Sequence, residues 1–280
     1  MTGRDEIVAR LRPVLDGRAL RLAALFGSGA RDALRTESDV DVAFVPLDPA
    51  MTLADELALQ AALEQAAGRS LDLVRLDRAS TLLRWRVARE GVPLLTQAPY
   101  DWARFVAQAG IEHGDFAPSY ARAAERLRQR IASGGAGRMT DAELVVQKLA
   151  VLHDHLARAR RRRPATSDLL RADVDLQDSL SMSVLVAIQE AIDIAFHIVS
   201  DEGWGAPASY AESFDVLQRH GVIEAATARV LSGAVGLRNR VAHAYASLDI
   251  DRLWVELPAG LDALEQYAQA IARFVPPLLG

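Results

Sequence analysis

The sequence predicts two domains, an α/β domain followed by an all-α domain. In the first part of the chain the apolar spacing changes repeatedly between the periods of helices and strands. A segment with three glycines and a serine, ASGGAGR, then interrupts the pattern over residues 132–138. Beyond this segment the apolar residues follow helical spacing. We therefore expect an α/β domain with a small mixed sheet over residues 1–131, a glycine-rich linker over 132–138 and a helical bundle over 139–280.

The elements of the first domain follow from apolar period, segment length and the residues that close each segment. Short apolar or alternating runs indicate strands, whereas longer runs with apolar residues three and four apart indicate helices. Gly27 ends the first strand, and Gly68 closes the second helix. In chain order we expect a helix over 5–15, strands over 19–27 and 39–45, a helix over 53–67, a strand over 70–76, a helix over 80–90, a short strand over 91–95 and a long helix over 101–131.

The second domain is expected to be built from helices alone. Pro258 lies near the start of the last helix, and because proline removes a helix hydrogen bond we expect a break or a kink there. The expected helices cover residues 141–162, 179–200, 209–219, 225–246 and 251–274.

Composition and charge exclude several classes of protein. The chain has no cysteine, which excludes disulfides and thiolate metal sites. Its net charge of −5 gives no overall basic field of the kind that marks many nucleic-acid-binding proteins. Lys148 is the only lysine, so we attribute the many arginines to a composition bias. No apolar run reaches the roughly 20 residues of a membrane span, and the N-terminus lacks an apolar signal segment. We expect a cytoplasmic protein with no membrane partner.

A first group of polar residues lies on the strands of the α/β domain. Gly27 and Ser28 end one strand, and two aspartates, Asp39 and Asp41, follow on the next. Because alternate residues of a strand point to the same face, these aspartates project together, and Asp72 joins them if its strand is a neighbour. Three carboxylates on one face repel one another unless a cation lies among them. Mg²⁺ prefers such oxygen ligands together with substrate phosphates, and a glycine lets phosphates approach the backbone.

This group has two interpretations. An Asp-x-Asp pair by itself is most often a solvated pair at the end of an edge strand. The complete set is rarer, because it combines Gly-Ser after one strand, Asp-x-Asp on the next and a further acid on a third. The complete set therefore favours a site for a metal ion and a nucleotide.

The region from about residue 10 to residue 130 resembles the minimal nucleotidyltransferases, specifically the MntA-type antitoxins, whose signature is Gly-Ser-x10-Asp-x-Asp. The resemblance implies a nucleotidyltransferase fold in which Gly27 and Ser28 hold the triphosphate of ATP. It further implies that Asp39 and Asp41 bind Mg²⁺. Asp72 would be the third acid of the metal site and the base for the incoming hydroxyl.

The chain departs from this family at two positions. The family usually has Ala-Arg-Gly after Gly-Ser-x, whereas Asp32 follows Ala30 and Arg31 here. Gly29 replaces a residue that is often basic. An extra acid near the phosphates is expected to weaken the binding of ATP.

A second group lies in VGLRNRVAHAY, near the end of the fourth expected helix of the bundle. Its polar members are Arg238, His243 and Tyr245. At about 100° per residue, Arg238 and Tyr245 lie on one stripe two turns apart, and His243 lies roughly 140° round the helix from Arg238. Histidine can move the protons of RNA cleavage while arginine holds the phosphate, so that no metal is needed. The alternative is a surface arginine and a histidine that caps the helix end.

Residues from about 141 to 275 resemble the HepT toxins of the HEPN superfamily, whose motif is Arg-x4-His-x-Tyr. The resemblance implies a HEPN helical bundle that cleaves RNA, with Arg238 and His243 as the catalytic pair, and that acts as a homodimer. Asn239 fits the polar residue that usually follows the arginine. Ala244 stands where the family usually has aspartate.

Three other features of the second domain have two interpretations each. Asp193 either orients the arginine of the motif or is a buried structural acid. His153 and His155 look like a metal pair, but residues two apart on a helix point in different directions, so we expect no metal there. The basic run 158–163 is mainly the solvated end of a helix, and contact with an RNA backbone is the second interpretation.

The two resemblances together predict a single-chain toxin–antitoxin fusion. In the families resembled, the nucleotidyltransferase is the antitoxin and transfers AMP from ATP to the motif tyrosine of the toxin, here Tyr245. The AMP adds bulk and negative charge two turns from Arg238, which is expected to repel RNA. Fusion raises the effective concentration of one domain near the other, in cis or in trans within a dimer.

Two alternative functions remain open. One is a nucleotidyltransferase that modifies a small molecule such as an aminoglycoside, with the helical domain serving substrate binding or dimerisation. The other is a non-catalytic binding or assembly protein whose two sites have decayed.

Overall fold

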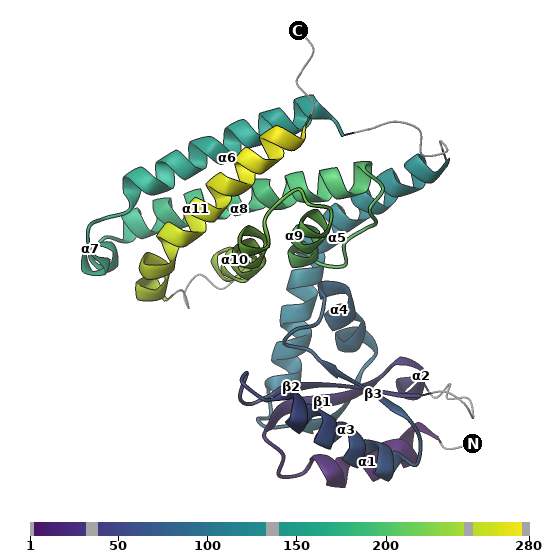
Figure 1. Ribbon diagram of the computed structural model, residues 1–280. Coiled ribbons are helices and arrows are strands. Elements are labelled where there is room, and N and C mark those ends of the chain that lie inside the picture. Colours follow the sequence, from purple (N-terminus) through teal and green to yellow (C-terminus); the bar gives the residue numbers. More distant parts are fainter. Residues whose placement is uncertain (1–2, 32–38, 133–139, 244–248, 276–280) are drawn as a thin grey trace. The chain divides into compact units, whose positions relative to one another are not determined.

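A computed structural model describes residues 3–31, 39–132, 140–243 and 249–275 (Figure 1). The chain forms two compact units, residues 1–114 and 115–280. The boundary falls within one helix, α5 (Asp101–Ala132), whose second half belongs to the second unit. The sequence places the end of the first domain at residue 131 and the start of the second at residue 139. These domain limits remain a prediction, because residues 133–138 of the expected linker lie outside the described residues.

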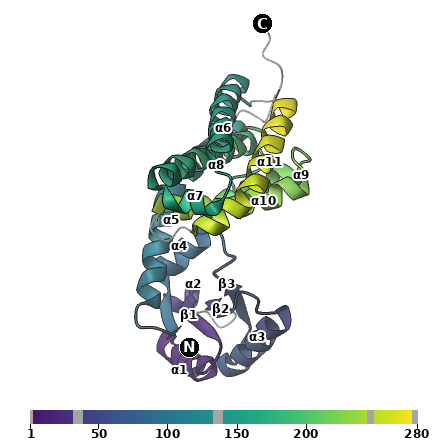
Figure 2. The same ribbon diagram turned by 90° about the vertical axis from the view of Figure 1, so that its left-hand side faces the viewer.

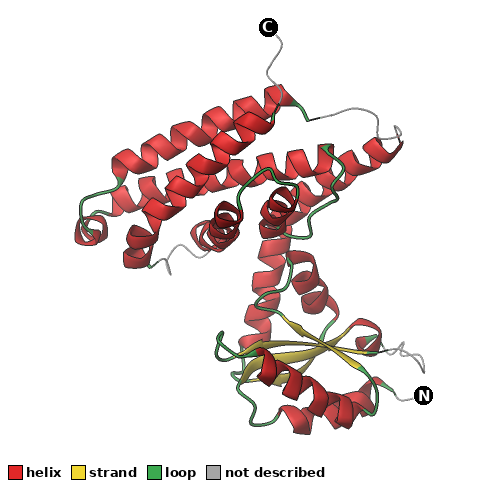
Figure 3. Cartoon of the chain, in the orientation of Figure 1, coloured by secondary structure: helices red, strands yellow, loops and turns green. Residues whose placement is uncertain are grey.

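The first unit contains a sheet of four strands, β1 (Leu20–Phe26), β2 (Val40–Pro46), β3 (Leu71–Arg75) and β4 (Val92–Thr96) (Figure 3). Their order in the sheet is β3-β2-β1-β4. Strand β1 runs antiparallel to β2 and β4, while β2 and β3 are parallel. The small mixed sheet expected from the sequence is thereby confirmed.

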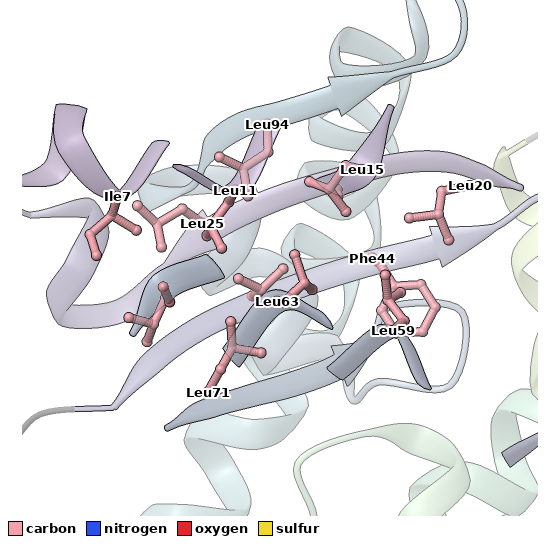
Figure 4. Packing of buried hydrophobic residues seen from close by; sticks show 14 of the residues in the cluster. Ile7, Leu11, Leu15, Leu20, Leu25, Phe44, Leu59, Leu63, Leu71 and Leu94 are labelled. Carbon is pink, nitrogen blue, oxygen red and sulfur yellow. The ribbon is translucent and has the colours of Figure 1, made fainter. Parts of the chain in front are cut away.

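Helices cover both faces of this sheet. On one face, α1 (Arg4–Leu15) and α3 (Leu53–Ala67) bury leucines against the strands (Figure 4). The other face is covered by α4 (Thr81–Glu90) and by the beginning of α5, which contributes Phe105. Local sequence fixes the ends of α3, since Thr52 and Asp55 form a capping box at its start and Gly68 is left-handed at its end. The four-residue helix α2 (Gly27–Ala30) follows β1 directly.

The second unit is built from helices, in agreement with the sequence. Helix α8 (Val174–Asp201) lies beside α6 (Ala142–Arg162) (Figure 2). Helix α10 (Ala225–His243) contacts α8, α9 (Tyr210–Arg219) and α11 (Ile250–Phe274). Phe116 of α5 is fully buried, with its ring centroid 5.8 Å from that of Phe196 and 5.2 Å from that of Tyr210. The second half of α5 and the short helix α7 (Ser167–Ala172) also belong to this unit.

Helix α8 is the core of this unit. Among the described residues, α8 is the one helix that is long and apolar enough to cross a membrane, since an 18-residue window of it has a mean hydropathy of 1.7. However, 67% of this window is buried inside the fold. The expectation that no segment reaches this length and composition was therefore wrong for α8. Burial by neighbouring helices explains the composition, because a helix that is apolar all round is typical of the centre of a bundle.

Two further differences from the sequence-based expectation have local causes. Helix α7, capped by Thr166, was missed because six residues are too few for a periodic pattern. Helix α11 continues through Pro258 instead of breaking there. Proline donates no N–H to the carbonyl of Trp254, four residues earlier, but Arg163 Nη2 donates to that oxygen at 3.3 Å. The guanidinium of Arg163 also lies 4.2 Å from the centre of the Trp254 ring.

Candidate functional site

The acidic residues of the first motif meet at one end of the sheet. Asp41 of β2 and Asp72 of β3 are register partners across the parallel pair, and Asp39 immediately precedes β2. Neighbouring strands lie about 4.8 Å apart, so the two partner carboxyl groups start from adjacent backbone positions. Asp39 and Asp72 are exposed and Asp41 is half-buried, and Ser70 donates a hydrogen bond to Asp39. The neighbourhood expected from the sequence is therefore present, while the roles of the three residues remain predictions.

Gly27 lies against this acidic end because β1 pairs with β2, with Phe26 opposite Asp41. The glycine has a left-handed backbone with φ of +68°. A Cβ atom at this position would collide with the carboxylate of Asp41, so only glycine leaves room for that side chain. Ser28 comes next and is half-buried.

The electrostatics of Asp41 reflect this crowding. Burial raises the pKa of Asp41, and the charges of Asp72 and Asp39 raise it further. Arg86 and Arg31 act in the opposite direction and lower it. The site is thus a set of mutually repelling carboxylates with two arginines close enough to offset part of the repulsion.

The donor set suits a hard cation that arrives with phosphates. Among the described residues, no three acidic or histidine side chains converge as a ready-made metal site. Mg²⁺ is nevertheless usually bound by one or two carboxylates, with waters and substrate phosphates completing its octahedron. Asp39 and Asp41 provide such a pair of oxygen donors. Asp32, where the chain departs from its resembled family, lies outside the described residues.

Arg238, the arginine of the second motif, is buried within the helical unit and is only 7% exposed. The guanidinium of Arg238 donates hydrogen bonds to both carboxylate oxygens of Asp115, from Nη1 to Oδ2 and from Nη2 to Oδ1, the second at 3.0 Å. Gln189 Oε1 accepts from Nε at 3.0 Å and from Nη2 at 2.8 Å. A longer bond of 3.4 Å runs from Nη1 to Asn239. These five bonds match the five N–H donors of an arginine.

A chain of hydrogen bonds behind Gln189 fixes the orientation of its amide. Gln189 Nε2 donates to Asp193 Oδ1 at 2.8 Å, and Lys148 Nζ lies 3.0 Å from Asp193 Oδ2 and 2.9 Å from Glu190. Burial opposes the charge of Lys148, but its bonds to Glu190 and Asp193 outweigh burial and raise its pKa. Asp193 therefore reaches Arg238 through Gln189 and not by direct contact.

The aromatic ring of Tyr210 packs against the guanidinium of Arg238. The guanidinium carbon lies 5.4 Å from the centre of the tyrosine ring, within the range of a cation–π contact. The hydroxyl of Tyr210 donates to the backbone oxygen of Asp115 at 2.8 Å. Burial raises the pKa of Tyr210, so this residue remains a neutral donor.

The other members of the second motif are only partly covered by the structure. His243 is the last residue of α10, and its side chain is not among those described. Tyr245 and Ala244 lie outside the described residues. Sequence reasoning missed Asp115 and Gln189. Gln189 had one usable signal, since it precedes Asp193 by four residues on the same helix, whereas Asp115 belongs to no motif.

The remaining candidates are the histidine pair and the basic run of α6. His155 is half-buried and His153 exposed, and neither belongs to a metal cluster among the described residues. Within the basic run 158–163, described contacts join Arg158 to Asp154, Arg160 to Asp262 and Glu265, Arg162 to Ser179 and Ser183, and Arg163 to Trp254. Most of this run therefore stabilises the bundle.

Known protein families match two separate regions of the chain. Residues 10–100 match the family model "Polymerase beta, Nucleotidyltransferase", and residues 152–271 match "Ribonuclease HepT-like". A putative protein adenylyltransferase of Methanocaldococcus jannaschii is 30% identical over 91 residues, which is 32% of this chain and 97% of that protein. The mRNA nuclease HepT of Shewanella oneidensis is 28% identical over 129 residues, which is 46% of this chain and 96% of that protein.

Two solved structures are also similar to part of the chain. One is a toxin–antitoxin with AMP-PNP, at 26% identity over 47% of this chain and 98% of that one, with a TM-score of 0.44. The other is a tri-AMPylated Shewanella oneidensis HEPN toxin in complex with MNT antitoxin, at 27% identity over 48% and 99%, with a TM-score of 0.44. The chain therefore belongs to the polymerase-beta nucleotidyltransferases in its N-terminal part, and its C-terminal part is similar to the HepT-like ribonucleases.

Proposed function

We propose that the chain is a toxin–antitoxin fusion in which the nucleotidyltransferase part transfers AMP from ATP to Tyr245 and thereby silences RNA cleavage by the HEPN part. One observation carries this proposal: the two enzyme families occur in series on one polypeptide. The names of the relatives give the expected activities, a protein adenylyltransferase for the first part and an mRNA nuclease for the second.

The first reaction is a nucleotidyl transfer. The phenol oxygen of Tyr245 attacks the α-phosphorus of ATP, the bond from that phosphorus to the bridging oxygen breaks, and pyrophosphate leaves. Asp72 takes the phenol proton, because it is exposed beside Asp41 at the end of the sheet. Gly27 and Ser28 hold the triphosphate. Mg²⁺ bound by Asp39 and Asp41 would neutralise phosphate charge when it enters with ATP.

The second reaction is RNA cleavage without a metal. Arg238 binds the scissile phosphate and stabilises the charge that develops on it, while His243 moves the proton of the attacking 2′-hydroxyl or of the leaving oxygen. A homodimer would bring two α10 helices, and with them two Arg238–His243 pairs, into one cleft.

Silencing follows from the position of the tyrosine in the sequence. Tyr245 follows Arg238 by seven residues, so an AMP on its oxygen places a phosphodiester charge close to the residues that bind RNA. An added anion near the nuclease arginine competes with RNA phosphates for the same positive charge. Each transfer is therefore expected to reduce RNA binding.

Intact-mass measurement tests the proposal. Full-length protein incubated with ATP and Mg²⁺ should gain AMP units, and the gain should vanish in Asp39→Ala/Asp41→Ala and in Tyr245→Phe. Asp16→Ala is a matched control, because Asp16 is an exposed acid at the end of α1, away from the acidic end of the sheet. Absence of any AMP on the wild-type protein, or transfer that persists in Tyr245→Phe, would contradict the proposal.

A further inference from the structure

The guanidinium of Arg238 has no N–H left over for a substrate in this structure. Its Nε and one N–H of Nη2 bind Gln189, and the second N–H of Nη2 binds Asp115. The Nη1 group binds Asp115 and Asn239. An RNA phosphate can therefore reach this arginine only if one of its present partners leaves.

Gln189 and Asp115 each accept two of these hydrogen bonds, but they differ in their surroundings and in their exposure to solvent. Gln189 is fixed from behind by Asp193 and Lys148, and its amide cannot turn without breaking those bonds. The side chain of Asp115 is 26% exposed, compared with 8% for that of Arg238, so it lies on the solvent side of the pair. Asp115 is therefore the partner that can be exchanged for a phosphate.

The chemistry of the exchange is matched. A carboxylate and a phosphate both offer two oxygens to the outer nitrogens of an arginine, and both form bidentate pairs with it. Asp115 occupies the Nη1 and Nη2 atoms that such a phosphate would use. It also cancels the positive charge that attracts RNA.

The position of Asp115 in the chain sets it apart from the nuclease. It lies on α5, between the matched regions 10–100 and 152–271, and thus outside both families' matched parts. Its backbone oxygen is held by Tyr210, so its side chain can turn away while its main chain stays in place. Once it has left, Gln189 and the Tyr210 ring still hold Arg238.

We propose that Asp115 is a built-in phosphate mimic that holds the nuclease arginine in an autoinhibited state and must be displaced by an RNA phosphate. This inference rests on the proposed role of Arg238 in binding RNA. It adds a second level of restraint to the AMP on Tyr245, one that acts before any nucleotide is transferred.

The test uses the full-length protein, free of AMP, and a single-stranded RNA oligonucleotide. Asp115→Asn keeps the shape of the side chain and removes its charge, and Asp115→Ser removes the second oxygen as well. Both are expected to lower KM about ten-fold, the scale of one charge-assisted hydrogen bond, and to leave kcat unchanged. Glu125→Gln is the matched control, because Glu125 is an exposed acid on the same helix that pairs with Arg128, and its KM should equal that of the wild type.

A positioning role for Asp115 would give the opposite pattern, with kcat reduced and KM unchanged, and would overturn the proposal. The same holds if wild type and both variants cleave RNA with equal KM, or if both variants fail to unfold cooperatively on heating, since Asp115 would then be a structural partner of Arg238. If no form of the protein cleaves or binds the RNA, the proposed nuclease function fails as well. Measuring the wild type first separates these two failures.

Discussion

Replacing Gly27 by alanine tests how closely the turn after β1 packs against the acidic end of the sheet. Gly27 has φ of +68°, a backbone conformation that costs an alanine about 1–2 kcal/mol. The new Cβ would also collide with the carboxylate of Asp41, and overpacking of this kind costs about 1–3 kcal/mol. We therefore expect the free energy of unfolding to fall by the sum of the two costs, about 2–5 kcal/mol.

Gly17→Ala provides the matched control. Gly17 has φ of +72°, yet a Cβ there would meet no atom within 4 Å. It should lose only the backbone cost of about 1–2 kcal/mol, so the difference between the two variants isolates the collision with Asp41. Urea unfolding gives the stabilities, and intact mass gives the transfer of AMP.

The effect on transfer should be larger than the effect on stability. Moving the Asp41 carboxylate by the width of a methyl group is expected to slow AMP transfer about a hundred-fold in Gly27→Ala, and Gly17→Ala should transfer normally. Equal stabilities of the two variants, together with full transfer by Gly27→Ala, would refute the close approach of Gly27 and Asp41 as a requirement of the site.

Two predictions concern pH. Because burial and the charges of Asp72 and Asp39 raise the pKa of Asp41, AMP transfer should fall on acidification at a pH above the usual aspartate value of about 3.9. Arg86→Gln removes a cation that lowers this pKa, so the acidic limb of the pH–rate profile should move to higher pH; an unmoved limb contradicts this electrostatic account. In the second unit, burial lowers the pKa of His197 to about 4. On acidification the unfolded chain therefore binds the proton before the folded protein does. The stability that neutral His197 contributes is fully present above about pH 6.5 and is lost as the pH falls toward 4. The free energy of unfolding should fall by about 3 kcal/mol over this range. Urea unfolding of wild type and His197→Gln at about pH 6.5 and about pH 4 checks this. An equal pH dependence of stability in the two proteins would exclude His197 as the cause of the loss.

The strands and their polar residues could be predicted because local pattern determines them. Alternation of acids and valines around Asp41 defines both a strand and its faces. The repeat of that pattern around Asp72 made a neighbouring strand the natural expectation, and the two residues are register partners. Apolar period and segment length were therefore enough to predict the helices and strands of the first unit in chain order. The order of the strands in the sheet, β3-β2-β1-β4, was not predicted, because it depends on tertiary contacts.

The surroundings of Arg238 could not be predicted in the same way. Asp115 is 123 residues away in sequence, and no periodic pattern links two residues on helices packed by tertiary contacts. Gln189 was overlooked because an uncharged residue in an apolar helix carries no chemical signal until its neighbours are known. The sequence left open whether Asp193 orients the arginine or is a buried structural acid, and it gave no means of recognising the amide between Asp193 and Arg238.

The continuity of helix α5 has a consequence for how this gene could be divided. Residues 115–132 belong to the second unit, and Phe116 fills the space between Phe196 and Tyr210. A protein expressed from residue 139 onward would lack that ring and would expose the rings of Phe196 and Tyr210 to water. Fission of the gene into two stable products is therefore expected to require a cut before Asp115, with the shorter product ending inside what is now a single helix.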